Sequence, residues 1–175
     1  MSRPRWLTRR EQRAWRAFVD MQHRLVGRVA RDLQRETGLS GADYEVLVQL
    51  SEAPDRRLRM CDLAARMHLS PSGLTRRLDG IVKLGFVVRE PAADDRRVTL
   101  AVLTDDGFAA LERAAPLHVD GVRRHLLDHM NREQVRAVGA ALAAVRAGRA
   151  ATAAGQAEKM CRGEAAAVTP AAARS

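Results

Sequence analysis

The chain has 175 residues, the length of one domain or of one domain plus a tail, and its 46% hydrophobic side chains suffice for a core. It has no apolar run of about 18 residues and no apolar stretch behind its charged N-terminus, so neither a membrane span nor a secretory signal is expected. Two cysteines argue against a disulfide framework and favour a reducing cytoplasm, while the net charge of +9 favours a polyanionic partner.

The positive charge is concentrated at the N-terminal end. Residues 1–37 hold ten Arg against four acidic residues, whereas residues 38–103 hold ten basic against nine acidic residues. Nucleic-acid binding therefore has to be inferred from the arrangement of the predicted elements, and the bulk charge gives it only mild support.

A long first helix is predicted from Thr8 to Glu36. Thr8 and Glu11 have the spacing of a capping box, and Gly38 should end the helix. Apolar residues recur with helical period along one broad face, which needs a partner helix to cover it. They are Trp15, Phe18, Val19, Leu25, Val26, Val29 and Leu33.

A shorter second helix should follow, capped by the segment from Ser40 to Asp43. Its apolar residues are Tyr44, Leu47, Val48 and Leu50. Residues 54–57 are predicted to form a loop, and Leu58 to add a short strand to a later sheet.

Residues 59–104 are predicted to form two helices, a turn between them, and a hairpin. The turn falls at His68-Leu69, and Ser70-Pro71 marks the start of the second helix because Ser is a preferred N-cap and Pro suits the first helical position. Gly85 should terminate this helix. Its buried stripe is predicted to comprise Leu74, Leu78, Ile81 and Leu84.

Two β-prone runs follow, residues 86–89 and 98–103, separated by a charged segment at 91–97. Two helices followed by a charged hairpin form a winged helix-turn-helix, in which the second helix enters a DNA major groove beside the hairpin tip. The expected fold class is therefore mainly α with a small β-wing.

Five short motifs occur in a fixed order along residues 8–149. They are Leu63-Ala64, Ser70-Pro71-Ser72, Leu84-Gly85-Phe86-Val87, Asp95-Arg96-Arg97 and Thr104-Asp105-Asp106-Gly107. Each motif alone is weak, but the ordered set between long helices resembles the MarR family, the multiple antibiotic resistance regulators. One departure is Gly80 within the second helix, where Gly costs roughly 1 kcal/mol relative to Ala; a close approach or local mobility would account for it.

After the hairpin, Thr104 should cap a helix that continues to Leu127, with a kink at Pro116. Residues 131–134 should cap a last helix. Its apolar residues are Val135, Val138, Leu142 and Val145. From about residue 150 the chain is rich in Ala and poor in large apolar residues, so a disordered tail is expected.

The predicted organisation has a helical dimerisation region at 1–36 and 104–149, a winged helix-turn-helix at 37–103, and a tail at 150–175. The long helices cannot all bury their apolar stripes on a small winged domain, so a second copy of the chain is expected. A dimer also suits a palindrome, whose half-sites lie about 34–36 Å apart. In the MarR family the terminal helices interlock, and the resemblance implies the same intertwined homodimer.

DNA contacts are expected from the exposed face of the second helix and from the hairpin tip. Arg pairs with guanine edges, hydroxyls suit phosphates or bases, and Arg also suits a narrow minor groove. The resemblance implies that Asp95 orients Arg97, whereas a solvated face or a surface ion pair is the alternative. The candidate residues are Ser70, Ser72, Thr75, Arg76, Arg77, Lys83, Asp95, Arg96 and Arg97.

Members of the family often bind small aromatic or phenolic acids, so Trp15, His23, Tyr44 and His118 could line an effector pocket. Packing in the core or in the dimer interface is the favoured alternative for each of them.

His118, His125 and His129 lie near one helix face, but nothing completes a ligand set, so no metal or cofactor is expected.

Cys61 lies in the first turn of the helix that precedes the turn at His68, where the helix N-terminus would lower a thiol pKa. The neighbouring Asp62 opposes this effect, so a packing role is favoured over a redox role. Cys161, in the tail, is expected to be inert.

The sequence therefore predicts a homodimeric transcriptional regulator that binds a pseudo-palindromic operator, as a repressor released by a small ligand. The alternative is a sequence-tolerant architectural DNA-binding protein without an effector, whose Arg-rich first helix wraps DNA. An enzyme is not expected, because the chain has no phosphate-cradling Gly motif and no paired carboxylates in an apolar setting.

Overall fold

The computed structural model of the chain describes residues 4–147, so the predicted tail at 150–175 and Cys161 lie outside the described residues. The elements are α1 (Arg9–Thr37), α2 (Gly41–Ser51), η1 (Pro54–Arg56), β1 (Arg57–Arg59), α3 (Met60–Arg66), α4 (Pro71–Lys83), β2 (Val87–Pro91), β3 (Thr99–Leu103), α5 (Asp105–His125), η2 (Leu127–His129) and a last helix at 132–147. The predicted fold class, mainly α with a small β-wing, is confirmed.

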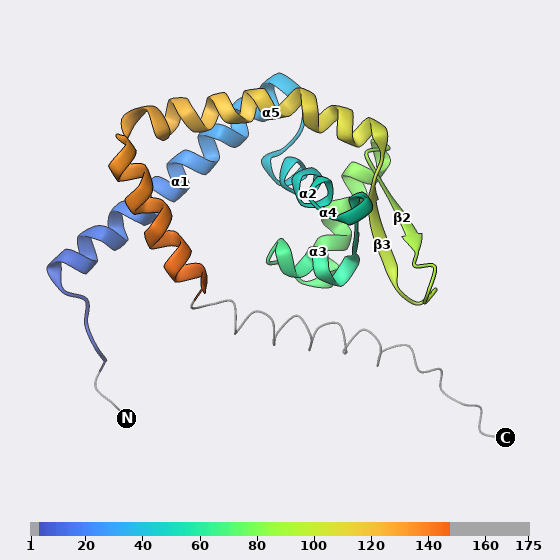
Figure 1. Cartoon of the computed structure of the whole chain (residues 1–175), viewed down its shortest axis with the longest axis horizontal. Helices are drawn as coiled ribbons and strands as arrows, with labels where there is room; N and C mark the ends of the chain where they lie inside the picture. The colour runs from blue at the N-terminus through green and yellow to red at the C-terminus, as the bar shows by residue number, and fades with distance from the viewer. Residues whose placement is uncertain (1–3, 148–175) are drawn as a thin grey trace.

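The two longest helices form an arch, with the winged helix-turn-helix beneath one end of it (Figure 1). The hairpin of β2 and β3 lies at the opposite end of the molecule from the start of α1, and the last helix descends on the same side as the start of α1. None of the helices within residues 4–147 combines the length and the hydrophobicity that a membrane span requires.

The capping box predicted at the start of α1 is present. The amide of Thr8 donates to Glu11 Oε2 at 2.7 Å, and the amide of Glu11 donates to Thr8 Oγ1 at 3.3 Å. At the other end Gly38 adopts the left-handed conformation, with φ 76°. Of the predicted apolar face only Val29 and Leu33 are buried, because only the C-terminal part of α1 packs on the winged unit.

The helix-turn-helix has the predicted boundaries. Ser70 caps α4, its Oγ accepting the amide of Gly73 at 3.1 Å, and Gly85 follows the helix with φ 75°. Of the predicted stripe, Leu74, Leu78 and Ile81 are fully buried. The prediction for Leu84 was wrong: it is 59% exposed, because α4 ends at Lys83 and the helical period cannot be extended beyond that end.

Three antiparallel strands form the wing sheet in the order β1-β3-β2. Leu58 of β1 lies opposite Ala101 of β3, which confirms the short additional strand, and Val87 of β2 lies opposite Leu103. Leu58, Val87 and Leu103 are buried against the helices, so the sheet fixes the hairpin to the helix-turn-helix.

Thr104 joins the end of β3 to the start of α5. Its Oγ1 accepts the amide of Gly107 at 3.0 Å and donates to the carbonyl of Gly85 at 2.8 Å. The helix continues through Pro116 without interruption and ends at His125, two residues before the predicted end. The last helix has the predicted cap, with reciprocal bonds of 2.9 Å between Asn131 and Gln134.

The hydrophobic core is continuous from the winged unit to both long helices. It brings Leu33 of α1 and Leu111 of α5 together with the buried residues of the winged unit. Within the described residues it contains no buried charged or polar side chain. The long helices are thus anchored in the core at one end of the arch.

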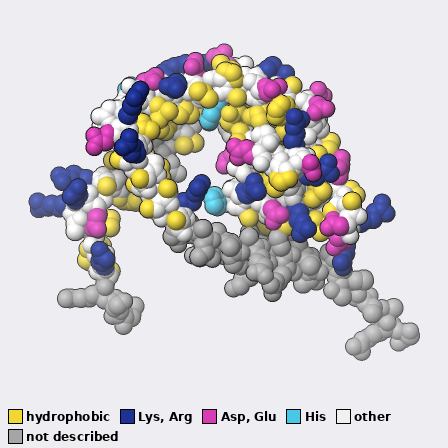
Figure 2. Space-filling view, in the orientation of Figure 1, with side chains coloured by type: hydrophobic (Ala, Val, Ile, Leu, Met, Phe, Trp, Pro, Cys, Tyr) yellow, Lys and Arg dark blue, Asp and Glu magenta, His cyan; other side chains and the backbone are white. Residues whose placement is uncertain are grey.

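The other end of the arch carries uncovered apolar side chains, and Figure 2 shows them as yellow patches on that arm. This apolar arm comprises Trp15, Phe18, Met21, Val138, Leu142 and Val145, whose exposed fractions lie between 44% and 61%. All residues of the last helix that the structure describes are exposed. Contiguous exposed apolar surface of this kind marks an interaction site.

Candidate nucleic-acid interface

The rotation of α4 about its axis is set by its buried stripe, since Leu74, Leu78 and Ile81 lie on one side. The opposite side is exposed and carries Ser72, Arg76 and Lys83. Neither Arg76 nor Arg77 forms a hydrogen bond or an ion pair within residues 4–147, so both guanidinium groups have all their donors available to a partner.

The three hydroxyl groups predicted to contact DNA differ in their local partners. The Oγ of Ser70 accepts the amide of Gly73, so its first role is to cap α4. Ser72 Oγ lies 3.3 Å from Ser70 Oγ, and Thr75 Oγ1 donates to the carbonyl of Pro71 at 3.0 Å. Ser72 and Thr75 are exposed, and each hydroxyl oxygen keeps acceptor capacity for a further bond.

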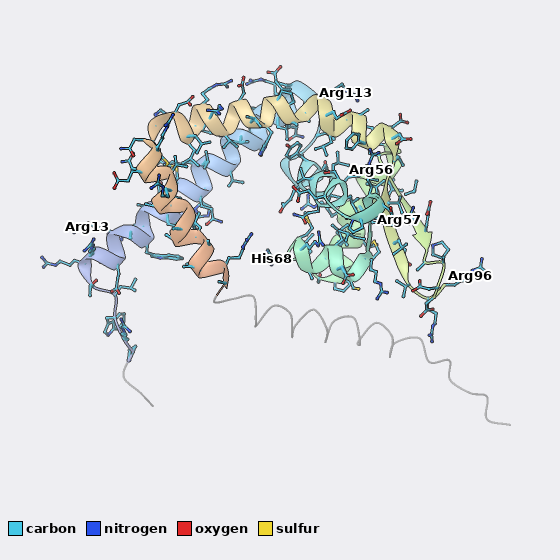
Figure 3. The ribbon with its side chains drawn as sticks, in the orientation of Figure 1. Arg13, Arg56, Arg57, His68, Arg96 and Arg113 are labelled. Carbon is cyan, nitrogen blue, oxygen red and sulfur yellow. The ribbon has the colours of Figure 1, made fainter. Side chains whose placement is uncertain are left out.

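At the wing tip, Asp95 holds the side chain of Arg97 by two bonds. Arg97 Nε donates to Asp95 Oδ1 at 3.1 Å and Nη2 donates to Oδ2 at 3.2 Å, while the amide of Arg97 also donates to Oδ1. These bonds lower the pKa of Asp95 and raise that of Arg97, so both groups stay charged at neutral pH. Arg96 projects from the tip of the hairpin, away from the body of the molecule (Figure 3).

Two further arginines brace the interface, and the sequence reasoning did not single them out. Arg89 of β2 bonds to Asp79 and to the carbonyl of Thr75, both in α4. Arg56 lies 3.8 Å from the centre of the Phe108 ring and bonds to Asp105 at 3.1 Å, which ties the loop after α2 to the start of α5. The alternation of β2 was a usable signal for Arg89, because it places Arg89 on the same face as the buried Val87.

The Arg-rich start of α1 lies far from this interface within one chain. Arg13, in this part of α1, is at the opposite end of the molecule from Arg96 (Figure 3). The high basic charge of residues 1–37 therefore does not add to the surface formed by α4 and the wing of the same chain.

Only two of the four effector-pocket candidates lie together. The rings of Tyr44 and His118 stack with centroids 4.5 Å apart, and burial raises the pKa of Tyr44 and lowers that of His118. Trp15 instead stacks on Phe18 in the apolar arm, at 6.1 Å, and His23 is exposed on α1. A nearby pocket of about 360 Å³ is lined by none of the four candidates. Its lining residues are Glu36, Thr37, Leu39, Phe86, Ala110, Arg113 and Leu117.

The three histidines of the C-terminal helical region have separate partners. His118 stacks on Tyr44, His125 Nε2 lies 3.0 Å from Asp32 Oδ2, and His129 Nε2 lies 3.1 Å from the carbonyl of Arg124. Within residues 4–147, no group of three or more His, Cys, Asp or Glu side chains could hold a metal ion. Cys61 is half-buried, and its Sγ lies 3.8 Å from Asp62 Oδ1.

Comparison with known proteins links this geometry to one family. The family model of the MarR family matches residues 37–98, which span α2 to the wing tip. The transcriptional repressor YetL of Bacillus subtilis is 31% identical over 114 residues, 65% of this chain and 63% of YetL. The matched part of the chain thus spans slightly less than two thirds of that relative.

Two solved structures from Streptomyces coelicolor are similar over most of the chain. A MarR family transcriptional regulator in complex with DNA is 38% identical, with a TM-score of 0.78 over 85% of this chain and 92% of that chain. The MarR family transcriptional regulator AbsC is 39% identical, with a TM-score of 0.75 over 81% of this chain and 95% of that chain.

Proposed function

Because the chain belongs to the MarR family of transcriptional regulators, we propose that it represses transcription by binding a pseudo-palindromic operator as a homodimer in the cytoplasm. The observation that carries this proposal is the exposed side of α4 beside the Asp95–Arg97 pair. An exposed helix side with the available guanidinium group of Arg76 suits a major groove, and an Arg held by Asp95 at the hairpin tip suits the adjacent minor groove. The similar regulator that was solved in complex with DNA supports this assignment.

The homodimer is proposed because of the apolar arm. In one chain, Phe18 of α1 and Leu142 of the last helix are 48% and 50% exposed, although each belongs to a helical apolar stripe. A second copy that contributes the same arm would cover both stripes in a two-fold interface. It would also place two α4 helices on one duplex, as a palindrome requires.

Release by a small ligand is the third part of the proposal. Tyr44 and His118 connect α2 of the winged unit to α5 of the arch through stacked, partly buried rings. A flat aromatic acid that competes for this stack would shift α2 relative to α5, and hence α4 relative to its symmetry mate. Such a ligand would release the operator only if it binds the shifted arrangement more tightly.

A sequence-tolerant architectural role is the second candidate function, and the observation that favours it is the Arg-rich start of α1. Wrapping DNA with α1 would use a surface that lies far from α4 and the wing in the same chain (Figure 3). The two functions differ in specificity, since a regulator should prefer its operator over random DNA by roughly 1,000-fold or more.

Selection from a random duplex library tests the proposal. The dimeric regulator should enrich a two-fold symmetric sequence whose half-sites lie about one helical turn apart. Fluorescence anisotropy on the enriched and a scrambled duplex, across a salt series, then gives the specificity ratio. Tight binding without enrichment would support the architectural role instead.

Light scattering tests the dimer separately. Leu142→Glu places a charge in the apolar arm and should yield a monomer with weak operator binding. Ala140→Glu is the matched control, because residue 140 lies on the opposite side of the same helix and is also exposed. If Leu142→Glu remained dimeric, the last helix would not form the interface.

A further inference from the structure

Arg89 links the wing to the middle of α4. Its Nη2 donates to Asp79 Oδ1 at 2.8 Å and to the backbone carbonyl of Thr75 at 2.9 Å. Arg89 lies opposite Ala101 in the sheet, at the centre of the β2–β3 ladder, so its backbone is fixed by the strands. One guanidinium group therefore joins the rigid part of the hairpin to both the backbone and a side chain of the proposed recognition helix.

Asp79 lies on the side of α4 that is proposed to face DNA. Ser72, Thr75 and Asp79 follow each other at steps of three and four residues, so they lie on one side of α4. Ser72 and Thr75 are proposed DNA contacts, which means that Asp79 places a negative charge on the side that approaches the phosphates. The side chain of Asp79 is 49% exposed, and Arg89 is the cation that pairs with it.

The guanidinium of Arg89 points toward α4. Its side chain is 30% exposed, compared with 86% for Arg97 at the wing tip. The bond to the Thr75 carbonyl points the guanidinium at the backbone of α4, at the residue that carries a proposed DNA-contacting hydroxyl. These features suit a brace between two DNA-contacting elements better than a phosphate contact.

We propose that Arg89 is a positioning residue for DNA recognition, which fixes α4 relative to the wing and neutralises Asp79 without contacting DNA. This inference rests on the proposed function, because it assumes that α4 and the wing read one operator together. A rigid link matters there, since a base contact depends on the alignment of donor and acceptor. Loss of the link would loosen the exposed side of α4 relative to the hairpin, while the buried Leu74, Leu78 and Ile81 would keep the helix in the core.

The experiment has to separate geometry from charge. Arg89→Lys keeps the positive charge, but its ammonium sits on a shorter and more flexible side chain, so it should hold α4 less rigidly than the guanidinium does. The double variant Arg89→Ala with Asp79→Ala removes both charges, so the local net charge is unchanged. Arg28→Ala, an exposed Arg on α1, is the matched control. Each is compared with the unaltered protein on the selected operator and a scrambled duplex across a salt series.

We expect both Arg89 variants to lower the operator-to-scrambled ratio by about tenfold, comparable to misalignment of one good base contact. Affinity for the scrambled duplex should stay within about twofold, and the salt slope should be unchanged because no phosphate-neutralising charge is lost. Arg28→Ala should change neither quantity. Melting temperatures of all variants should lie close to that of the unaltered protein, because both side chains of the Arg89–Asp79 pair are partly exposed and such pairs contribute little to stability.

The possible failures can be told apart. If the unaltered protein enriches an operator but Arg89→Lys and the double variant keep the full ratio, Arg89 acts only as a charge and the positioning role is wrong. A salt slope lowered by about one unit in the double variant would identify Arg89 as a phosphate contact and also overturn it. If the unaltered protein has no sequence preference, the proposed regulator function fails, and the positioning role fails with it.

Discussion

His125 and Asp32 clamp the end of α5 to α1, with His125 Nε2 3.0 Å from Asp32 Oδ2. The two side chains are 18% and 26% exposed, which makes this the least exposed contact between an acidic and a basic side chain among the described residues. Arg124 and Arg35 flank the same carboxylate at 3.6 Å and 3.7 Å. The hydrogen bond from His125 is the main reason why the pKa of Asp32 lies below its ordinary value.

This clamp predicts an acid-sensitive contribution to stability. Because the pKa of Asp32 is lower in the folded chain than its ordinary value of 3.8, its ionisation stabilises the fold at higher pH. This contribution is lost as the pH falls below about 4, through the folded pKa. Asp32→Asn should therefore have a lower Tm at neutral pH and a smaller loss of Tm on acidification.

Circular dichroism melts between about pH 3 and about pH 7 measure both effects. Asp120→Asn is the matched control, because Asp120 is 70% exposed and lies 4.0 Å from Arg124. Its melting curve should follow that of the unaltered protein. Parallel pH profiles for Asp32→Asn and the unaltered protein would show that the clamp does not contribute to stability.

Substitution of two glycines by Ala should change the stability of the fold in opposite directions. A Cβ at Gly107 would lie 2.1 Å from the carbonyl oxygen of Phe86, so Gly107→Ala should displace the start of α5 and cost about 1–3 kcal/mol. A Cβ at Gly80 would meet nothing within 4 Å, so Gly80→Ala should stabilise the exposed face of α4 by about 0.5–1 kcal/mol. Urea denaturation measures both, and destabilisation by Gly80→Ala would mean that Gly80 is needed for another reason.

The caps and turns of this fold could be predicted because each depends on residues close together in the sequence. Thr8 with Glu11, Ser70 with Gly73 and Thr104 with Gly107 all form the expected bonds. The error at Leu84 came from extending a helical period beyond the helix end, where the backbone direction changes. The fold class and the wing strands followed from the same local patterns.

The candidate site was harder to predict from the sequence, because the contacts that hold it together join residues far apart in the chain. Arg89 and Asp79 are ten residues apart, and Arg56 and Asp105 are 49 apart. Periodicity places each residue on a face, but it does not show which face of one element packs on another. For the same reason Tyr44 and His118 could be named as candidates, whereas their stacking could not be predicted.

Substitution of His68, in the turn of the helix-turn-helix, should stabilise the fold. His68 has φ 53°, a left-handed conformation that costs an L-residue roughly 1–2 kcal/mol and that Gly adopts freely. His68→Gly should therefore raise the free energy of unfolding by up to about 1 kcal/mol, or Tm by about 2–4 °C. Gly85→Ala, at φ 75°, is the reciprocal control and should lower Tm. A lower Tm for His68→Gly would reveal a stabilising contact of the imidazole.

The last prediction separates the contribution of α4 from that of the wing. Arg76 lies on the exposed side of α4, opposite the buried Leu74 and Leu78. Arg76→Ala should cost about 1–3 kcal/mol on the operator if the guanidinium contacts a base edge, and much less on scrambled DNA. The ratio between the two affinities should fall accordingly, while the salt slope changes little.

Arg97→Ala should act differently, because Asp95 holds the Arg97 guanidinium at an exposed tip and no core residue fixes its approach to a base. We expect both duplexes to bind more weakly and the salt slope to fall by about one unit, as for a lost phosphate contact. Asp95→Asn keeps the charge of Arg97 but weakens its anchor, so it should reduce operator affinity without lowering the slope. Anisotropy across a salt series distinguishes these outcomes. If Arg97→Ala abolished the ratio while Arg76→Ala left it intact, the wing would read the sequence and α4 would only position it.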